Sequence, residues 1–123
     1  MLISIIGLSG LFILNLTFGM KYGFGFRHYW FFELEHFLGG FFMAMFFANF
    51  TDSNILIFAG IAIMSFIWET AEYLLGKIPK LSTGFKKTFN FKKNMNLQPK
   101  WQDTILDIIL NFIGATIFVY FVL

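Results

Sequence analysis

The feature that most constrains this chain is a series of four apolar runs, at residues 1–20, 29–50, 54–75 and 101–123. An α-helix of about 20 residues crosses the roughly 30 Å hydrocarbon core of a bilayer, and it satisfies its own backbone polar groups. Only 13% of the residues are charged, whereas soluble domains carry about 25%. The pattern predicts an all-α, polytopic membrane protein of one domain, with four transmembrane helices in a bundle.

The basic residues predict how these helices are oriented. All nine lysines and arginines lie in two segments, residues 21–28 and 76–100, and four spans would place both segments on the same side. Because basic loops are retained in the cytoplasm, we expect both segments to be cytoplasmic and both termini to lie outside, in a protein of the inner (cytoplasmic) membrane. The chain has no cysteine, which excludes disulfides and thiolate metal sites.

The longer basic segment, residues 76–100, is treated as a loop that alternates lysine with phenylalanine. Such a segment can lie on the membrane surface and bind anionic lipid headgroups, or its charge can serve only to set the topology. We do not expect nucleic acid as a partner, because the sequence shows no folded module that would present this charge to it. The candidate headgroup-binding residues are Lys86, Lys87, Lys92 and Lys93, with Phe85, Phe89 and Phe91 between them.

Polar residues form a stripe in the fourth apolar run. Asp103, Asp107 and Asn111 are four residues apart, and on a helix each step of four turns by only about 40°. Gly114 continues the same stripe. A carboxylate at the centre of a membrane helix costs roughly 2.5–3.5 kcal/mol. Two such residues on one face therefore indicate a functional site.

The second and third runs place acids and a histidine at the same expected depth as this stripe. Glu33 and His36 begin the second run, and Glu69 and Glu72 end the third. With 1.5 Å per residue, all lie within roughly 12 Å of the cytoplasmic boundary. Glu35 is about 100° from His36 around its helix, and we expect it to point elsewhere, toward the interface or a lysine. Three glycines on the polar faces should let the helices approach closely: Gly39, Gly40 and Gly114.

One hypothesis for these residues is a divalent-metal site. Glu33 and His36 have the Glu-x-x-His spacing of four-helix carboxylate metal proteins, which use two such pairs where this chain has one. Carboxylates with one imidazole suit Mg²⁺, Mn²⁺, Zn²⁺ or Fe²⁺. Asn111 and Ser65 would support the ligands as an outer layer. The predicted ligands are Glu33, His36, Glu69, Glu72, Asp103 and Asp107.

Two other hypotheses account for the same residues. Asp107, His36 and Glu69 would perform acid–base catalysis or relay protons without a metal. Alternatively, the acids nearest the interface pair with Lys77 or Lys100, while His36 only forms a hydrogen bond with Asp107 inside the bundle. Within the apolar runs no lysine or arginine is available to neutralise the acids.

Three motifs resemble the VanZ-like and YjdF-like families of small integral membrane proteins. They are His36-Phe37-Leu38-Gly39-Gly40-Phe41, Trp68-Glu69-Thr70-Ala71-Glu72, and Trp101-Gln102-Asp103-Thr104-Ile105-Leu106-Asp107 followed by Asn111 and Gly114. The resemblance implies a polytopic inner-membrane protein, and the VanZ branch, which is linked to glycopeptide tolerance, implies a role in the cell envelope. The positions that match the family motifs are His36, Glu69, Glu72, Asp103, Asp107 and Asn111.

The expected function is that of a membrane-embedded enzyme or lipid-binding protein that acts on an anionic lipid or an envelope precursor. A proton- or cation-coupled transporter and a small structural subunit are the alternatives, and an oligomer is compatible with each. The halves of the helices at residues 41–50 and 115–123 are almost free of polar groups. This disfavours transport through a single copy.

Overall fold

The computed structural model describes residues 1–92 and 101–123, and every regular element in these ranges is a helix. The predicted all-α class is therefore confirmed. In chain order the helices are α1 (Leu2–Leu14) with its continuation η1 (Asn15–Lys21), α2 (Phe24–Arg27), α3 (Trp30–Phe47), α4 (Asn54–Lys77), α5 (Pro79–Thr88) and α6 (Trp101–Ile117) with its continuation η2 (Phe118–Val122).

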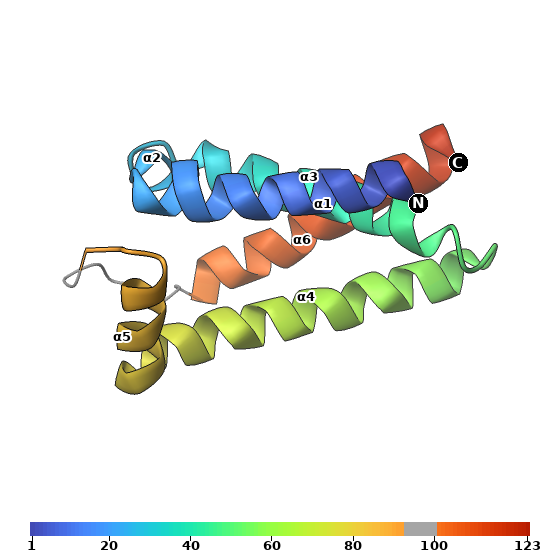
Figure 1. The fold of residues 1–123 in the computed structure, drawn as a ribbon. Coiled ribbons are helices and arrows are strands. Elements are labelled where there is room, and N and C mark those ends of the chain that lie inside the picture. Colours follow the sequence, from blue (N-terminus) through green and yellow to red (C-terminus); the bar gives the residue numbers. More distant parts are fainter. Residues whose placement is uncertain (93–100) are drawn as a thin grey trace.

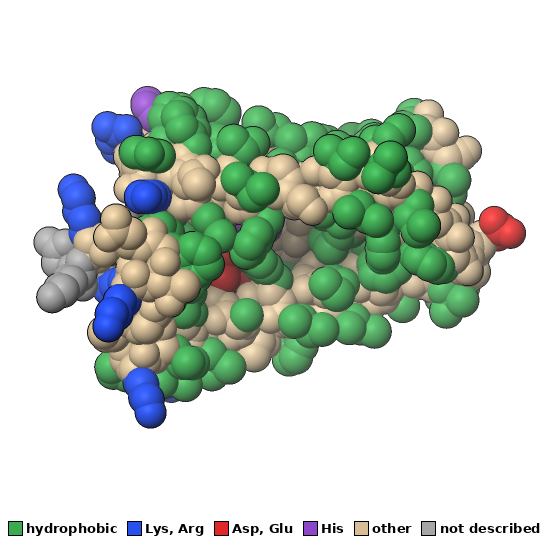
Figure 2. Space-filling model, viewed as in Figure 1, with side chains coloured by type: hydrophobic (Ala, Val, Ile, Leu, Met, Phe, Trp, Pro, Cys, Tyr) green, Lys and Arg blue, Asp and Glu red, His purple; other side chains and the backbone are tan. Residues whose placement is uncertain are grey.

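The long helices run side by side along one axis (Figure 1). The two chain termini lie at one end of the bundle, here called the terminal end, whereas α2 and α5 lie at the other end, here called the basic end. Lysine and arginine side chains gather at the basic end on the face shown in Figure 2.

Among the described residues, three helical segments are long and apolar enough to cross a membrane: Leu2–Lys21, Asn54–Lys77 and Trp101–Val122. They indicate a membrane protein. The predicted second span is α3, which has 18 residues and carries Glu33, Glu35 and His36; it does not belong to this set. That α3 also crosses the membrane, which would bring the number of spans to four, thus stays a prediction.

The outer surface of the bundle agrees with a lipid environment. Ile55, Phe66 and Phe121 are 81%, 72% and 83% exposed, although such side chains are normally buried in soluble proteins. Figure 2 shows apolar side chains along the length of the visible face. The interior near the terminal end is apolar as well, with a buried cluster of Ala44, Ile57, Ile61, Ala115, Phe118 and Val119.

The segment expected to be a loop contains a helix, α5. Ile78 is extended and ends α4, as expected for a residue before proline. Pro79 then begins α5, where its missing N–H group costs nothing. After the helix, Asn90 adopts a positive φ of 59° and the chain turns back, so that the Phe91 ring lies 5.3 Å from the Phe85 ring. In the described part of this segment, residues 76–92, the phenylalanine rings therefore pack against one another.

The closest approach between long helices is that of α3 and α6, and it occurs at glycines. A Cβ atom on Gly114 would overlap the Phe37 carbonyl oxygen, and one on Gly40 would overlap the Asn111 carbonyl. The two backbones are therefore in direct contact, as expected for small residues at membrane helix interfaces. Gly39 is less crowded, since its Cβ would lie 3.6 Å from Asn111 Oδ1.

Replacing either interface glycine should destabilise the bundle. We expect Gly40→Ala and Gly114→Ala each to lower the free energy of unfolding by about 1–3 kcal/mol, because a backbone atom must move to admit the methyl group. Denaturation of the purified protein in mixed micelles measures the change. Gly10→Ala is the matched control, because nothing lies within 4 Å of its Cβ position. Equal effects at all three sites would contradict the packing argument.

Candidate metal-binding site

Three side chains from three different helices meet inside the bundle. His36 from α3, Glu69 from α4 and Asp107 from α6 each offer a ligand atom, and these atoms lie within 4.8 Å of one another. The Nε2 atom of His36 is 3.2 Å from Oδ2 of Asp107, and both side chains are about 15% exposed. This group of three, here called the His36 triad, is close enough to hold a metal ion.

Glu69 is the member of the triad that has no cationic partner among the described residues. The residue is only 8% exposed, and both of its carboxylate oxygens are buried without a hydrogen-bond partner of ordinary geometry. The neighbouring polar groups are the Thr104 side chain and a second acid, Glu72. An unpaired buried carboxylate is strongly unfavourable, so this position calls for a cation or a proton.

The helix contacts explain why these side chains meet. His36 lies one turn before Gly40, and Asp107 lies two turns before Gly114 on the facing helix. The backbone contact at the glycines therefore holds the starts of α3 and α6 together. Asn111 donates a buried hydrogen bond of 3.1 Å from Nδ2 to Oγ of Ser65, which ties α6 to α4.

Asn111 and Ser65 are predicted to lie next to the ligands, and this bond joins them there. Ser65 and Glu69 share one face of α4, one turn apart. Asn111 and Asp107 stand in the same relation on α6. The Asn111–Ser65 pair therefore fixes how α4 and α6 present their carboxylates to each other.

The other three predicted ligands lie outside the triad. Asp103 accepts a hydrogen bond of 2.6 Å from the Tyr29 hydroxyl, which links the starts of α3 and α6. Glu72 interacts with the Trp68 side chain. Glu33 is partly buried in the first turn of α3. These acids surround the triad without joining the group of three ligand atoms.

Glu35, which the sequence predicts to reach the interface or a lysine, has an amide of η1 as its hydrogen-bond partner. Its Oε2 atom accepts a hydrogen bond of 2.7 Å from Nδ2 of Asn15, and its Oε1 atom is buried without a partner. The reason is that α1 and η1 cover this face of α3. Asn15, the one amide in the first apolar run, is the sequence signal that could have identified this contact.

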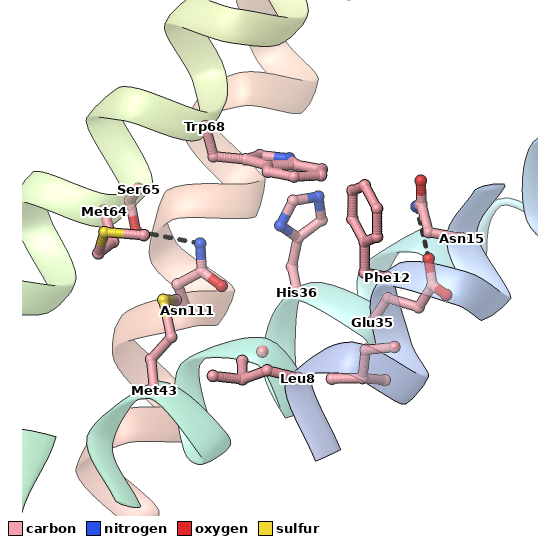
Figure 3. A pocket seen from close by; sticks show the side chains of 12 residues that line it. Leu8, Phe12, Asn15, Glu35, His36, Met43, Met64, Ser65, Trp68 and Asn111 are labelled. Carbon is pink, nitrogen blue, oxygen red and sulfur yellow. Dashed lines mark hydrogen bonds between the residues drawn. The ribbon is translucent and has the colours of Figure 1, made fainter. Parts of the chain in front are cut away.

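Two cavities border the triad. The first, of about 280 Å³, lies between α1 and α4; His36 and Glu35 line it, with Phe12 and Trp68 beside the imidazole ring (Figure 3). Figure 2 shows an acidic side chain at the bottom of a depression between these helices. The second, of about 600 Å³, lies between α4 and α6 and is lined by Glu69, Tyr73 and Gln102 among others.

The predicted headgroup-binding lysines lie near α5. Lys86 is partly buried, whereas Lys87 and Lys92 are exposed; Lys93 lies outside the described residues. Beside the second cavity, Lys77 donates a hydrogen bond of 2.6 Å to the Tyr73 hydroxyl.

In comparisons with known proteins, no protein-family model, no curated protein and no solved structure matches the chain. The resemblance to the VanZ-like and YjdF-like families therefore stays a prediction, and we infer the function from the site itself.

Removing the unpaired carboxylate should stabilise the protein in the absence of metal. We expect Glu69→Met to raise the free energy of unfolding by about 1–3 kcal/mol in the presence of a chelator, since an apolar side chain of similar size replaces a buried charge. Glu33→Met is the control, because it removes an acid outside the triad. Thermal unfolding in detergent gives both values. If Glu69→Met instead lowers the free energy of unfolding, as the loss of an ordinary buried contact does, the Glu69 carboxylate is well compensated in the wild type.

Proposed function

We propose that this protein is a four-span membrane protein that binds a divalent cation at the His36 triad and acts there on an anionic lipid or an envelope precursor. The observation that carries the proposal is the convergence of one imidazole and two carboxylates from three helices, with Glu69 buried beside Thr104 and the acid Glu72 and without a cationic partner among the described residues. A cation would compensate the charge that the described residues leave unanswered.

The position of α3 supports a fourth span. With 18 residues it is about 27 Å long, close to the thickness of a bilayer core. It packs against both α1 and α6, which are parts of segments long and apolar enough to cross. An element enclosed by crossing helices must share their depth. Because the termini lie opposite the basic end (Figure 1), the positive-inside rule places the basic end in the cytoplasm.

The donor set suits a catalytic or exchangeable ion better than a closed structural one. Three protein ligands leave at least one position for water or substrate, as in catalytic zinc sites. Donors around a tetrahedral ion at about 2.0–2.1 Å are roughly 3.3 Å apart. The His36–Asp107 separation already has this value, so only Glu69 must move inward. Oxygen-rich ligation fits Mg²⁺, Mn²⁺, Zn²⁺ or Fe²⁺, and any of these would polarise a bound phosphoryl or carbonyl oxygen.

The surroundings of the triad favour an anionic amphiphile as the molecule acted upon. The cavity between α4 and α6 leads to Glu69, and Lys77 lies at the end of the same helix. In α5, Lys86 and Lys87 occur in the last turn, beside the packed phenylalanine rings. Lysines beside apolar rings are typical of segments that lie on an anionic membrane surface.

The interior of the terminal half favours an enzyme or binding protein over a transporter. Between the triad and the chain termini, the described core contains the apolar cluster that includes Ile57, Ile61 and Phe118, and the buried hydroxyl of Ser4 is occupied by a hydrogen bond to the Met1 carbonyl oxygen. A path for ions or protons would need polar groups at that depth. The proposal therefore places the chemistry on the cytoplasmic side of the membrane.

The metal proposal predicts a stoichiometric ion. Elemental analysis of protein equilibrated with Mg²⁺, Mn²⁺, Zn²⁺ or Fe²⁺ should give about one ion per chain, and His36→Ala or Asp107→Asn should weaken binding by more than about 100-fold, because loss of a ligand exceeds loss of an outer partner. Asp52→Asn, in the exposed turn between α3 and α4, should retain the ion. A metal-free wild type, or one whose ion survives both substitutions, would contradict the proposal.

The lipid preference predicts a role for the lysines of α5. In nanodiscs of mixed phosphatidylglycerol and phosphatidylcholine, Lys86→Gln combined with Lys87→Gln should lower the enrichment of phosphatidylglycerol around the protein severalfold, because each basic residue contributes about 1 kcal/mol at such a surface. Mass spectrometry of retained lipids measures the enrichment, with Thr83→Gln as the control on the same helix. Unchanged enrichment would mean that the lysines serve only to set the topology.

A further inference from the structure

A second candidate site lies in the cavity between α1 and α4, here called the α1–α4 groove, which is lined by His36 but not by Glu69. Apolar side chains form most of its walls: Leu8, Leu11 and Phe12 of α1, Met43 of α3, and Met64 and Trp68 of α4 (Figure 3). Both α1 and α4 belong to segments that can cross a membrane. An apolar groove between two such helices opens sideways into the bilayer, where the available occupant is a lipid chain.

The groove has one polar end, formed by Glu35 and Asn15. Asn15 occupies Oε2 of Glu35 at 2.7 Å, and Oε1 is left buried without a partner. The adjacent His36 does not serve this carboxylate, since its Nε2 atom lies 3.2 Å from Asp107. No lysine or arginine in residues 1–92 and 101–123 forms an ion pair with Glu35. The free oxygen therefore lacks a donor, and the carboxylate lacks a positive charge.

The depth of Glu35 matches the boundary between headgroups and lipid chains. It lies five residues after Trp30, the first residue of α3, or about 8 Å along the helix. Asn15 lies six residues before the end of η1, or about 9 Å. Each headgroup layer of a bilayer is roughly 6 Å thick. A lipid whose chain occupies the groove would thus have its polar group beside Oε1.

We propose that the α1–α4 groove binds one chain of a lipid with a primary ammonium headgroup, and that Glu35 Oε1 accepts a hydrogen bond from this ammonium. An ammonium group supplies both the donor and the charge that the carboxylate lacks, whereas a hydroxyl supplies only the donor. The volume of about 280 Å³ is at the lower end for ligand pockets and suits part of a single chain. The site goes beyond the proposed metal chemistry, because it uses a different acid on a different face of α3.

Trp68 makes the groove accessible to measurement. Its ring packs edge-on against Phe12 at 5.9 Å across the groove, so a chain that enters must lie against the indole. Trp30 and Trp101, which are 55% and 69% exposed, can be replaced by phenylalanine to leave Trp68 as the one fluorescent tryptophan. Bromine atoms on a lipid chain quench tryptophan fluorescence only at close contact.

The experiment uses the full chain with Trp68 alone, in phosphatidylcholine nanodiscs that contain a small fraction of brominated-chain lipid. Brominated phosphatidylethanolamine should quench Trp68 at about one tenth of the mole fraction that brominated phosphatidylcholine requires, since a charge-assisted hydrogen bond is worth about tenfold in affinity. Glu35→Gln should remove this difference. Glu33→Gln, two residues away and on another face of the same helix, should keep it.

A second set of variants tests the groove itself. Gly39→Leu and Leu8→Phe each add bulk to the lining and should abolish quenching by every brominated lipid. Gly10→Leu should not, because Gly10 has open space around it and does not line the cavity. Either filled variant suffices if the other fails to fold. Equal quenching by the ethanolamine and choline lipids, or a preference that survives Glu35→Gln, would overturn the proposal; metal binding by the same variants separates this result from failure at the His36 triad.

Discussion

Backbone contact between α3 and α6 is the constraint on which the rest of the structure depends. In a bilayer, helices gain little from burying apolar surface against each other, and close packing must provide the attraction. Gly40 and Gly114 allow one backbone to lie against the carbonyl groups of the other. The same contact fixes the separation of His36 and Asp107, which lie in the second turns of the two helices. Packing and site are thus one feature, and a side chain at either glycine would alter both.

The buried acids impose a cost that the fold accepts at a single depth. Glu69 has two unpaired oxygens and Glu35 has one, although buried polar groups in native proteins nearly always have partners. The terminal half of the bundle contains no comparable group in its described core. Uncompensated charge confined to one level, close to the basic end, is typical of a site that receives its counterpart from outside the chain.

Much of the architecture could be predicted because it follows from periodicity and charge. The apolar runs at residues 1–20, 54–75 and 101–123 correspond closely to Leu2–Lys21, Asn54–Lys77 and Trp101–Val122. The four-residue spacing on α6 correctly placed Asp107 and Asn111 on the face that meets α3 and α4. Depth, derived from helix direction, placed His36, Glu69 and Asp107 at one level, and the structure groups them. The same reasoning also placed Glu33, Glu72 and Asp103 there, and they lie outside the group.

The remaining features depend on rotation and on local order, which periodicity does not provide. A helical wheel places Glu35 away from His36, but it does not say that α1 covers that face and presents Asn15 to it. Likewise, Asp103 shares the stripe of Asp107 and yet accepts a hydrogen bond from Tyr29. Asp103 lies one turn closer to the basic end than Asp107, and there it meets the start of α3 and not the triad. In the basic segment, the lysine-rich composition predicted a loop, but Pro79 begins a helix there and phenylalanine rings pack at its end.

The two cavities border the triad on both sides of α4, and in the proposed four-span arrangement both would face the bilayer. His36 lines the α1–α4 groove and Glu69 lines the cavity between α4 and α6, so α4 separates two lateral openings that lead to one group of ligands. Soluble substrates would need a polar entrance from the end of the bundle. An amphiphile needs only a gap between helices at the depth of its headgroup, and the proposed topology would place the acids at that depth. Under the proposed function, lateral entry would explain why a site with this much uncompensated charge lies beneath apolar walls.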